Sequence, residues 1–406
     1  MKAESVSQTI EEAIARAEKN DWTGTISRLQ QLPLESLSHK PSPLINSEWE
    51  QICQLALQIL EQGDFQQQWE IANILGRLGE RVIPFLITLL ENPHANLDSR
   101  WFAGRILSQF NHPDSIVALA KLLQKTQEED LALMASQSLG HLGSAAVEHL
   151  NKLLQAPESR LLAVLALAQI RRVETITPLL QVTDDDLPAI RITAIEALGS
   201  FHNERVLPAL LAALKDPIAA VRREAIAALS RRRPAELPAN LASEFALLVY
   251  DLNPAVCQEA ALALGRLGTE EATLALSAAF KSPSTAIALK RNIVLALSWL
   301  SSSSALDCLQ AGLLESNTEI CREIIAALGR QQSPTLKAMA VEILRDFLDS
   351  GQPVTSQPQV KQLVATSLGE LGLATAVAPL QLLAAHDEPG IRLHARAALQ
   401  KIAPDH

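Results

Sequence analysis

One short pattern recurs along almost the whole chain. An apolar run with helical spacing ends in leucine followed by a small or polar residue, as in ILGRLG at 74–79 and ALGRLG at 263–268. The residue after the leucine is Gly76, Ser108, Gly140, Ala168, Gly199, Ser230, Gly265, Ser298, Gly329, Gly369 and Gln400. Successive spacings are 32, 32, 28, 31, 31, 35, 33, 31, 40 and 31 residues. Such a near-constant period indicates a stacked repeat protein.

Each repeat is predicted to contain two helices. The first carries the marker residue near its end, where a glycine or another small residue lets the chain turn. The second begins after a short turn, and in several repeats a proline lies near its start, where the missing N–H would be unpaired anyway. These prolines are Pro84, Pro178, Pro208 and Pro379. Each helix has one apolar stripe, which only neighbouring repeats can cover.

The composition favours the same architecture. Aromatic residues make up only 3% of the chain, while Leu and Ala supply most of the 48% hydrophobic content. Leu and Ala are strong helix formers, and no alternating strand pattern is evident. We therefore expect an all-α fold, a right-handed α-α superhelix of about eleven two-helix repeats.

A second pattern opens several first helices, in DLPAIRITAIEALGS (186–200), DPIAAVRREAIAALS (216–230) and DEPGIRLHARAALQ (387–400). An aspartate near the helix start is expected to accept its free N–H groups. An arginine follows at a fixed step, six residues for Asp185 to Arg191 and for Asp216 to Arg222. We interpret these charges as structural, with the arginine reaching the equivalent aspartate or a loop carbonyl of an adjacent repeat.

The units resemble HEAT repeats, in particular the short variety of the phycobilisome-lyase group. The matching segments are DPIAAVRREAIAALS, DDLPAIRITAIEALG and the LGRLG endings, and the resemblance covers roughly 65–403. It implies an Asp–Arg ladder between repeats, and it suggests a photosynthetic bacterium as the setting. The ladder carries over to Asp185/Arg191 and Asp216/Arg222 and, more loosely, to Asp387/Arg392, five residues apart; it is interrupted where Cys257, Cys321 and Lys290 replace the arginine.

The two ends of the chain are predicted to differ. Residues 1–62 do not follow the period and are expected to form an N-terminal helical cap or module, with a partner-specific arm as the alternative. Helices are predicted at 9–19, 23–31 and 48–61, with a loop rich in Ser and Pro at 32–47. The repeat solenoid is predicted over 63–406, with lengthened loops at 231–244 and 349–359 that are surface insertions or binding features.

The chain carries no recognisable catalytic or nucleotide-binding motif, so no cofactor is expected. Its four scattered cysteines, Cys53, Cys257, Cys308 and Cys321, lack nearby histidines for a metal site and fit a reducing compartment. A net charge of −10 disfavours nucleic acid as a partner. Neither a membrane-spanning apolar run nor a secretory signal is present. These features predict a cytoplasmic protein.

A protein partner is therefore the expected ligand. Arg231, Arg232 and Arg233 form the strongest local basic cluster and are tentative partner-binding residues, although cations also suit a helix C-terminus. The second helices, predicted to line a concave surface, are nearly uncharged at 273–280, 305–314 and 375–385, which suits an apolar or helical partner.

The function predicted is a non-catalytic scaffold or adaptor that assists assembly or regulation of a protein complex in a photosynthetic bacterium. One alternative is a phycobilin lyase or lyase-like subunit, against which the single tyrosine, Tyr250, and the dispersed tryptophans weigh. Another is an accessory factor in iron–sulfur cluster assembly.

Overall fold

The computed structural model describes residues 3–32, 46–315 and 317–402. Over these residues the regular elements are α-helices and short 3₁₀ turns, as the sequence predicts. The chain divides into two compact units, Met1–Phe201 and His202–His406, and each is described by itself. The predicted loop at 32–47 lies almost entirely outside the described residues.

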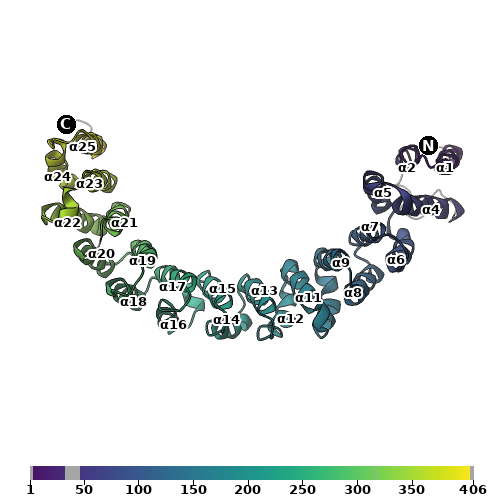
Figure 1. The fold of residues 1–406 in the computed structure, drawn as a ribbon, viewed down its shortest axis with the longest axis horizontal. Helices are drawn as coiled ribbons and strands as arrows, with labels where there is room; N and C mark the ends of the chain where they lie inside the picture. Colours follow the sequence, from purple (N-terminus) through teal and green to yellow (C-terminus); the bar gives the residue numbers. More distant parts are fainter. Residues whose placement is uncertain (1–2, 33–45, 316, 403–406) are drawn as a thin grey trace. The chain divides into compact units, whose positions relative to one another are not determined.

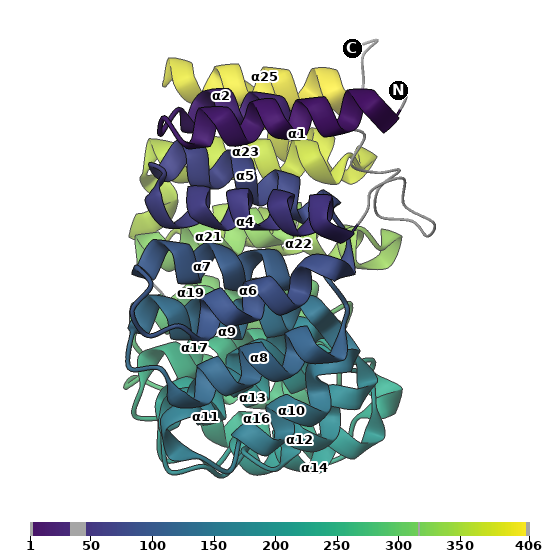
Figure 2. The same ribbon diagram turned by 90° about the vertical axis from the view of Figure 1, so that its right-hand side faces the viewer.

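The first unit begins with α1 (Ala3–Ala17), α2 (Trp22–Gln30) and α4 (Asn46–Gln62), close to the three predicted helices. Its later first helices are α5 (Phe65–Arg77), α7 (Leu97–Leu107), α9 (Glu129–Leu142), α11 (Pro157–Ile170) and α13 (Pro188–Gly199). Its second helices are α6 (Ile83–Glu91), α8 (Pro113–Lys125), α10 (Val147–Leu153) and α12 (Ile176–Leu180). Because α4 packs against α5, α6 and α7, the N-terminal helices continue the stack; Figure 2 shows α4, α6 and α8 following one another.

The second unit repeats the same arrangement. Its first helices are α15 (Ala219–Ser230), α17 (Pro254–Leu267), α19 (Ile287–Trp299), α21 (Thr318–Gly329), α23 (Pro358–Leu371) and α25 (Pro389–Ile402). Its second helices are α14 (Leu207–Ala213), α16 (Leu241–Leu248), α18 (Glu270–Lys281), α20 (Ser303–Glu315), α22 (Pro334–Asp349) and α24 (Val377–Ala384). The two lengthened loops contain 3₁₀ turns, η5 (Pro234–Glu236) and η6 (Pro353–Ser356).

The two helices of each pair form separate rows. In each unit taken alone, the first helices lie on the inner side of the bend and the second helices on the outer side (Figure 1). The expectation that the second helices line the concave surface is therefore wrong. The apolar core lies between the rows and is built mainly from Leu, Ile, Val and Ala side chains.

The marker residues explain why the stack bends toward the first helices. A Cβ added at Gly265 on α17 would lie 2.8 Å from both the Cα and the Cβ of Ala296 on α19. The same close approach occurs between Gly329 and Ser367 and between Gly369 and Ala398. Small residues let consecutive first helices approach more closely than the bulkier second helices can.

The turn that follows is made by a different glycine. Gly79, Gly143, Gly268 and Gly372, each three residues after a marker, have φ between 69° and 78°, a conformation that favours glycine. The prediction that the marker itself permits the turn is therefore wrong. The marker permits close packing within the helix, and the second glycine of the LGxLG pattern reverses the chain.

Candidate functional site

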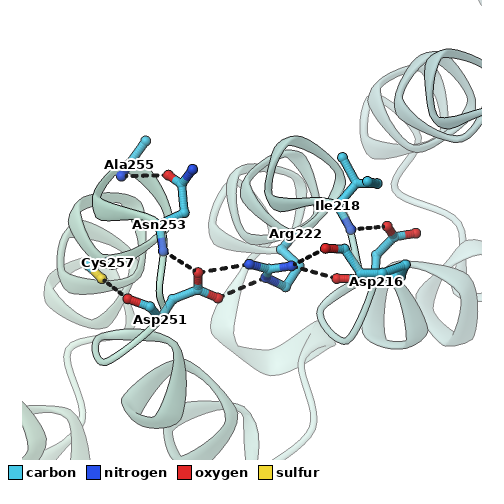
Figure 3. Close-up of polar contacts among 8 residues, drawn as sticks. Asp216, Ile218, Arg222, Asp251, Asn253, Ala255 and Cys257 are labelled. Atoms are coloured by element: carbon cyan, nitrogen blue, oxygen red, sulfur yellow. Dashed lines mark hydrogen bonds and ion pairs between the residues drawn. The ribbon is translucent and has the colours of Figure 1, made fainter.

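Arg222 joins one repeat to the next. From α15 its Nη1 donates to the backbone oxygens of Asp216 and Pro217, at 2.7 and 3.1 Å. Its Nε and Nη2 donate to the two carboxylate oxygens of Asp251, before α17, at 2.8 Å each (Figure 3). The arginine side chain is 15% exposed and the aspartate side chain 8%. Arg222 thus holds its own loop by carbonyl contacts and the following repeat by a bidentate ion pair.

The protonation states of this pair follow from its contacts. Burial alone would raise the pKa of Asp251, but the hydrogen bonds from Arg222 and from the backbone N–H of Asn253 outweigh burial and leave the pKa below its usual value. The hydrogen bond to Asp251 is the main reason that the pKa of Arg222 is raised. Both groups are therefore charged at neutral pH.

The loop aspartates share one local geometry. Asp185, Asp216 and Asp251 each accept the backbone N–H two residues later, at 2.9, 2.8 and 2.8 Å. The residue six positions later then donates to the carbonyl of the aspartate: Arg191 at 2.7 Å, Arg222 at 2.7 Å and Cys257 Sγ at 3.0 Å. Each aspartate therefore fixes the loop that enters a first helix.

A further ladder arginine was missed in the sequence. Arg160 on α11 donates from Nη1 to Asp185 Oδ2 of the next repeat at 2.8 Å, and from Nε to the carbonyl of Leu154 at 2.7 Å. The residue six positions before it is a leucine, so a search for Asp–Arg pairs does not find it. The useful signal is the position of the arginine in its own helix.

The last repeat departs from the predicted pairing. His386, not Asp387, occupies the loop position: the backbone N–H of Glu388 donates to His386 Nδ1 at 3.1 Å, and Arg392 Nη1 donates to the His386 carbonyl at 2.9 Å. Asp387 contributes only its carbonyl to Arg392. The six-residue step is therefore kept, and the predicted Asp387–Arg392 pair is out of register by one residue.

The three consecutive arginines do not form one basic surface. Arg232 is buried at 6% exposure, and its Nη2 donates to the carbonyl of Asn203 at 3.3 Å. Arg233 pairs with Glu236 at 2.6 Å, and Arg231 lies 3.5 Å from Glu224. Burial also lowers the pKa of Arg232. A partner would meet only Arg231 and Arg233, each of which already contacts a carboxylate.

The strongest candidate binding surface lies on three first helices of the first unit. A groove of about 430 Å³ opens over the N-terminal turns of α5, α7 and α9. Its apolar lining consists of Phe65, Leu97, Trp101, Phe102, Leu131, Leu133 and Met134, and we call it the aromatic groove. Phe102 anchors the floor, with ring centroids 5.6 Å from Phe65 and 5.3 Å, edge to face, from Trp101.

The large side chains around the groove recur with the repeat period. Trp69, Trp101 and Leu133 are separated by 32 residues each and lie at the same position of α5, α7 and α9. Trp69 is 50% exposed, Leu133 44% and Phe65 65%. The tryptophans that look dispersed in the sequence are thus brought onto adjacent helices, and the spacing of 32 was the signal for this.

The rim of the aromatic groove is acidic. Asp98, Glu128 and Asp130 line it, and Gln137 is the other polar lining residue. The first turns of α7 and α9 carry these carboxylates, where they also interact favourably with the helix dipoles. The groove therefore combines exposed aromatic surface with negative charge.

Other predicted chemistry is described briefly. All four cysteines are buried and free, and burial raises the pKa of Cys53 to about 12. Within residues 3–32, 46–315 and 317–402, no group of three His, Cys, Asp or Glu side chains is placed to hold a metal ion. None of the helices in the described part of the chain has the length and apolar character required to span a bilayer.

The architecture defines a helical repeat protein, and comparison with known families identifies which kind. The family model for HEAT repeats matches residues 53–140, 147–230 and 244–329, more than half of the chain. The chain therefore belongs to the HEAT-repeat family. The match starts inside α4, ahead of the predicted solenoid boundary at 63, and it does not single out the phycobilisome-lyase type.

Solved structures share this fold. The chain is similar to Kap95p, whose binding induces the switch loops of RanGDP to adopt the GTP-bound conformation, with 12% identity and a TM-score of 0.56 over 99% of this chain and 67% of that one. It is also similar to the karyopherin Kap121p bound to the extreme C-terminus of the phosphatase Cdc14p, with 13% identity and a TM-score of 0.50 over 94% and 51%. Among curated proteins, no sequence match was found.

Proposed function

We propose that the protein is a non-catalytic protein-binding scaffold that docks a partner in the aromatic groove. The observation that carries this proposal is the row of Trp69, Trp101 and Leu133 on consecutive first helices, beside a groove with an aromatic floor. Exposed clusters of large apolar side chains with a polar rim are typical of protein interaction sites. The two karyopherin neighbours, both described with protein partners, support the same class of function.

The partner is an amphipathic helix with basic residues beside its apolar face. Neighbouring packed helices lie about 8–10 Å apart, and residues i and i+7 of a helix laid across them are separated by about 10 Å. Such a helix can place successive apolar side chains between Trp69, Trp101 and Leu133. Lysine or arginine next to them would meet the carboxylates of Asp98 and Asp130.

This proposal places the partner on the inner side of the first unit, and it makes the protein an adaptor in assembly or regulation of a complex. The resemblance of the repeats to the phycobilisome-lyase group supports a photosynthetic bacterial setting, and four unpaired cysteines support a cytoplasmic one. The lyase alternative is disfavoured because the rim carboxylates, Asp98, Glu128 and Asp130, would repel the propionates of a tetrapyrrole.

The test is selection of helical peptides from a randomised display library on the full-length chain, followed by fluorescence anisotropy of one selected peptide. The enriched peptides are expected to carry apolar residues at i, i+3, i+4 and i+7 with flanking Lys or Arg. Trp101→Ala and Leu133→Ala should each weaken binding at least tenfold. Trp299→Ala is the matched control, since Trp299 is a 43% exposed tryptophan on a first helix of the other unit.

The charged rim is tested separately. Replacement of Asp98, Glu128 and Asp130 together by their amides should weaken the basic peptide and flatten its salt dependence. Enrichment of acidic peptides, or equal affinity for the wild-type chain and Trp101→Ala, would rule out the groove as the docking surface.

A further inference from the structure

The last rung of the ladder contains two facing donors. Lys361 on α23 occupies the place from which Arg160 and Arg222 reach the following loop, and its Nζ lies 3.0 Å from His386 Nε2. At the earlier rungs the loop side chain is the carboxylate of Asp185 or Asp251. At this rung an imidazole stands where a carboxylate would neutralise the cation.

The hydrogen bonds of His386 fix where its ring proton lies. A backbone N–H can only donate, so His386 Nδ1, which is 3.1 Å from the N of Glu388, must accept and carries no hydrogen. The proton of the neutral ring is then on Nε2, which faces Lys361. A lysine ammonium has three donors and no acceptor. The Lys361–His386 contact therefore sets N–H against N–H, and an acceptor is missing.

A cavity lies against these two side chains. It has a volume of about 300 Å³ and is formed between α22, α23 and α24. Lys361, His386 and Arg345 supply its donors, and Leu348, Leu382 and Leu383 supply apolar walls. Asp349 also lines the cavity and carries the opposing charge, while Arg345 is bound to the neighbouring Asp346 at 3.0 Å. The volume is sufficient for a small ligand group.

We propose that this cavity, the terminal ladder cavity, binds a carboxylate carried on an apolar body. The carboxylate accepts hydrogen bonds from Lys361 Nζ and His386 Nε2 and so takes the role of the missing aspartate. The apolar body packs against Leu382 and Leu383. The carboxylate belongs either to a free organic acid or to the C-terminus of a peptide that ends in an apolar residue. The site lies in the second unit and is independent of the aromatic groove.

The first experiment compares charged and neutral probes by ligand-observed NMR titration of the full chain. Hexanoate is expected to bind at least tenfold more tightly than hexanamide, which has the same apolar body without the charge. A peptide ending in leucine with a free carboxylate is compared with its amidated form. A tighter peptide assigns the site to a C-terminus, and a tighter hexanoate assigns it to a free acid. Equal binding of charged and neutral forms in both pairs would overturn the proposal.

Two variants make the test specific to this rung. His386→Asp supplies the carboxylate that earlier rungs have, so it should abolish hexanoate binding while leaving the chain at least as stable in urea. Asp349→Asn removes the negative charge from the rim and should strengthen binding severalfold. Circular dichroism confirms that both variants are folded. Unchanged hexanoate affinity in His386→Asp would show that the ligand does not occupy this rung.

Discussion

Replacement of Arg222 by alanine tests the inter-repeat ladder most sharply. The substitution removes two hydrogen bonds to Asp251 and two to the loop carbonyls of Asp216 and Pro217. Hydrogen bonds to charged groups contribute about 1.5–3 kcal/mol each, and breaking a buried ion pair by removing one partner costs about 3–5 kcal/mol. Because both side chains retain some exposure and Asp251 keeps its bond from Asn253, we expect a loss of about 3 kcal/mol in the free energy of unfolding.

The assay is urea unfolding followed by far-UV circular dichroism at pH 7 and fixed salt. Repeat arrays can unfold in stages, so hydrogen exchange of the amides in α15 and α17 should localise the loss to the two joined repeats. Arg223→Ala is the matched control, since Arg223 is the exposed neighbour on the same helix and its loss should change stability by less than about 0.5 kcal/mol. If Arg222→Ala and Arg223→Ala behave alike, the ladder does not hold the repeats together.

The same contribution depends on pH in a defined direction. The pKa of Asp251 is lowered in the folded protein, so its pairing stabilises the fold above the unfolded pKa of about 3.9 and is lost as pH falls through the lower folded value. The stability difference between the wild-type chain and Arg222→Ala should therefore be constant from pH 7 to about 5 and shrink below about pH 4. A difference that stays constant down to pH 2 would contradict the ion-pair assignment.

Two further predictions concern packing and thiol chemistry. Gly265→Ala should destabilise the chain by about 1–3 kcal/mol, because the new methyl group would lie 2.8 Å from the Ala296 Cα and Cβ; adding Ala296→Gly should recover part of the loss, and strictly additive urea midpoints would disprove the close approach. Ellman's reagent at pH 8 should react with all four cysteines only after unfolding, because each thiol is buried and burial raises its pKa; rapid native labelling of even one would show that its helix opens readily.

The sequence was sufficient for the repeat architecture because each repeat is a local unit. Helix, turn and apolar stripe are encoded within about thirty residues and recur, so the spacing of the markers located every first helix. The relation between the rows was harder. Which row lies inside depends on how closely Gly265 approaches Ala296 relative to the contacts of the second helices, and a periodic pattern alone does not contain that comparison.

The binding surfaces were missed for related reasons. Trp69, Trp101 and Leu133 meet only when three repeats stack in register, although their spacing of 32 residues was visible. The search for aspartate at the start of each ladder rung selected Asp387 and so passed over His386, the residue whose chemistry differs. Motifs chosen by residue type find the regular rungs, whereas the unusual one is found by position.

Hydrogen–deuterium exchange on the full chain, with and without a peptide selected as described above, tests the docking surface most directly. The account predicts slower exchange confined to the first turns of α5, α7 and α9, and loss of this protection in Trp101→Ala. Protection on the second helices, such as α6 and α8, or in the second unit would place the binding surface elsewhere and contradict it.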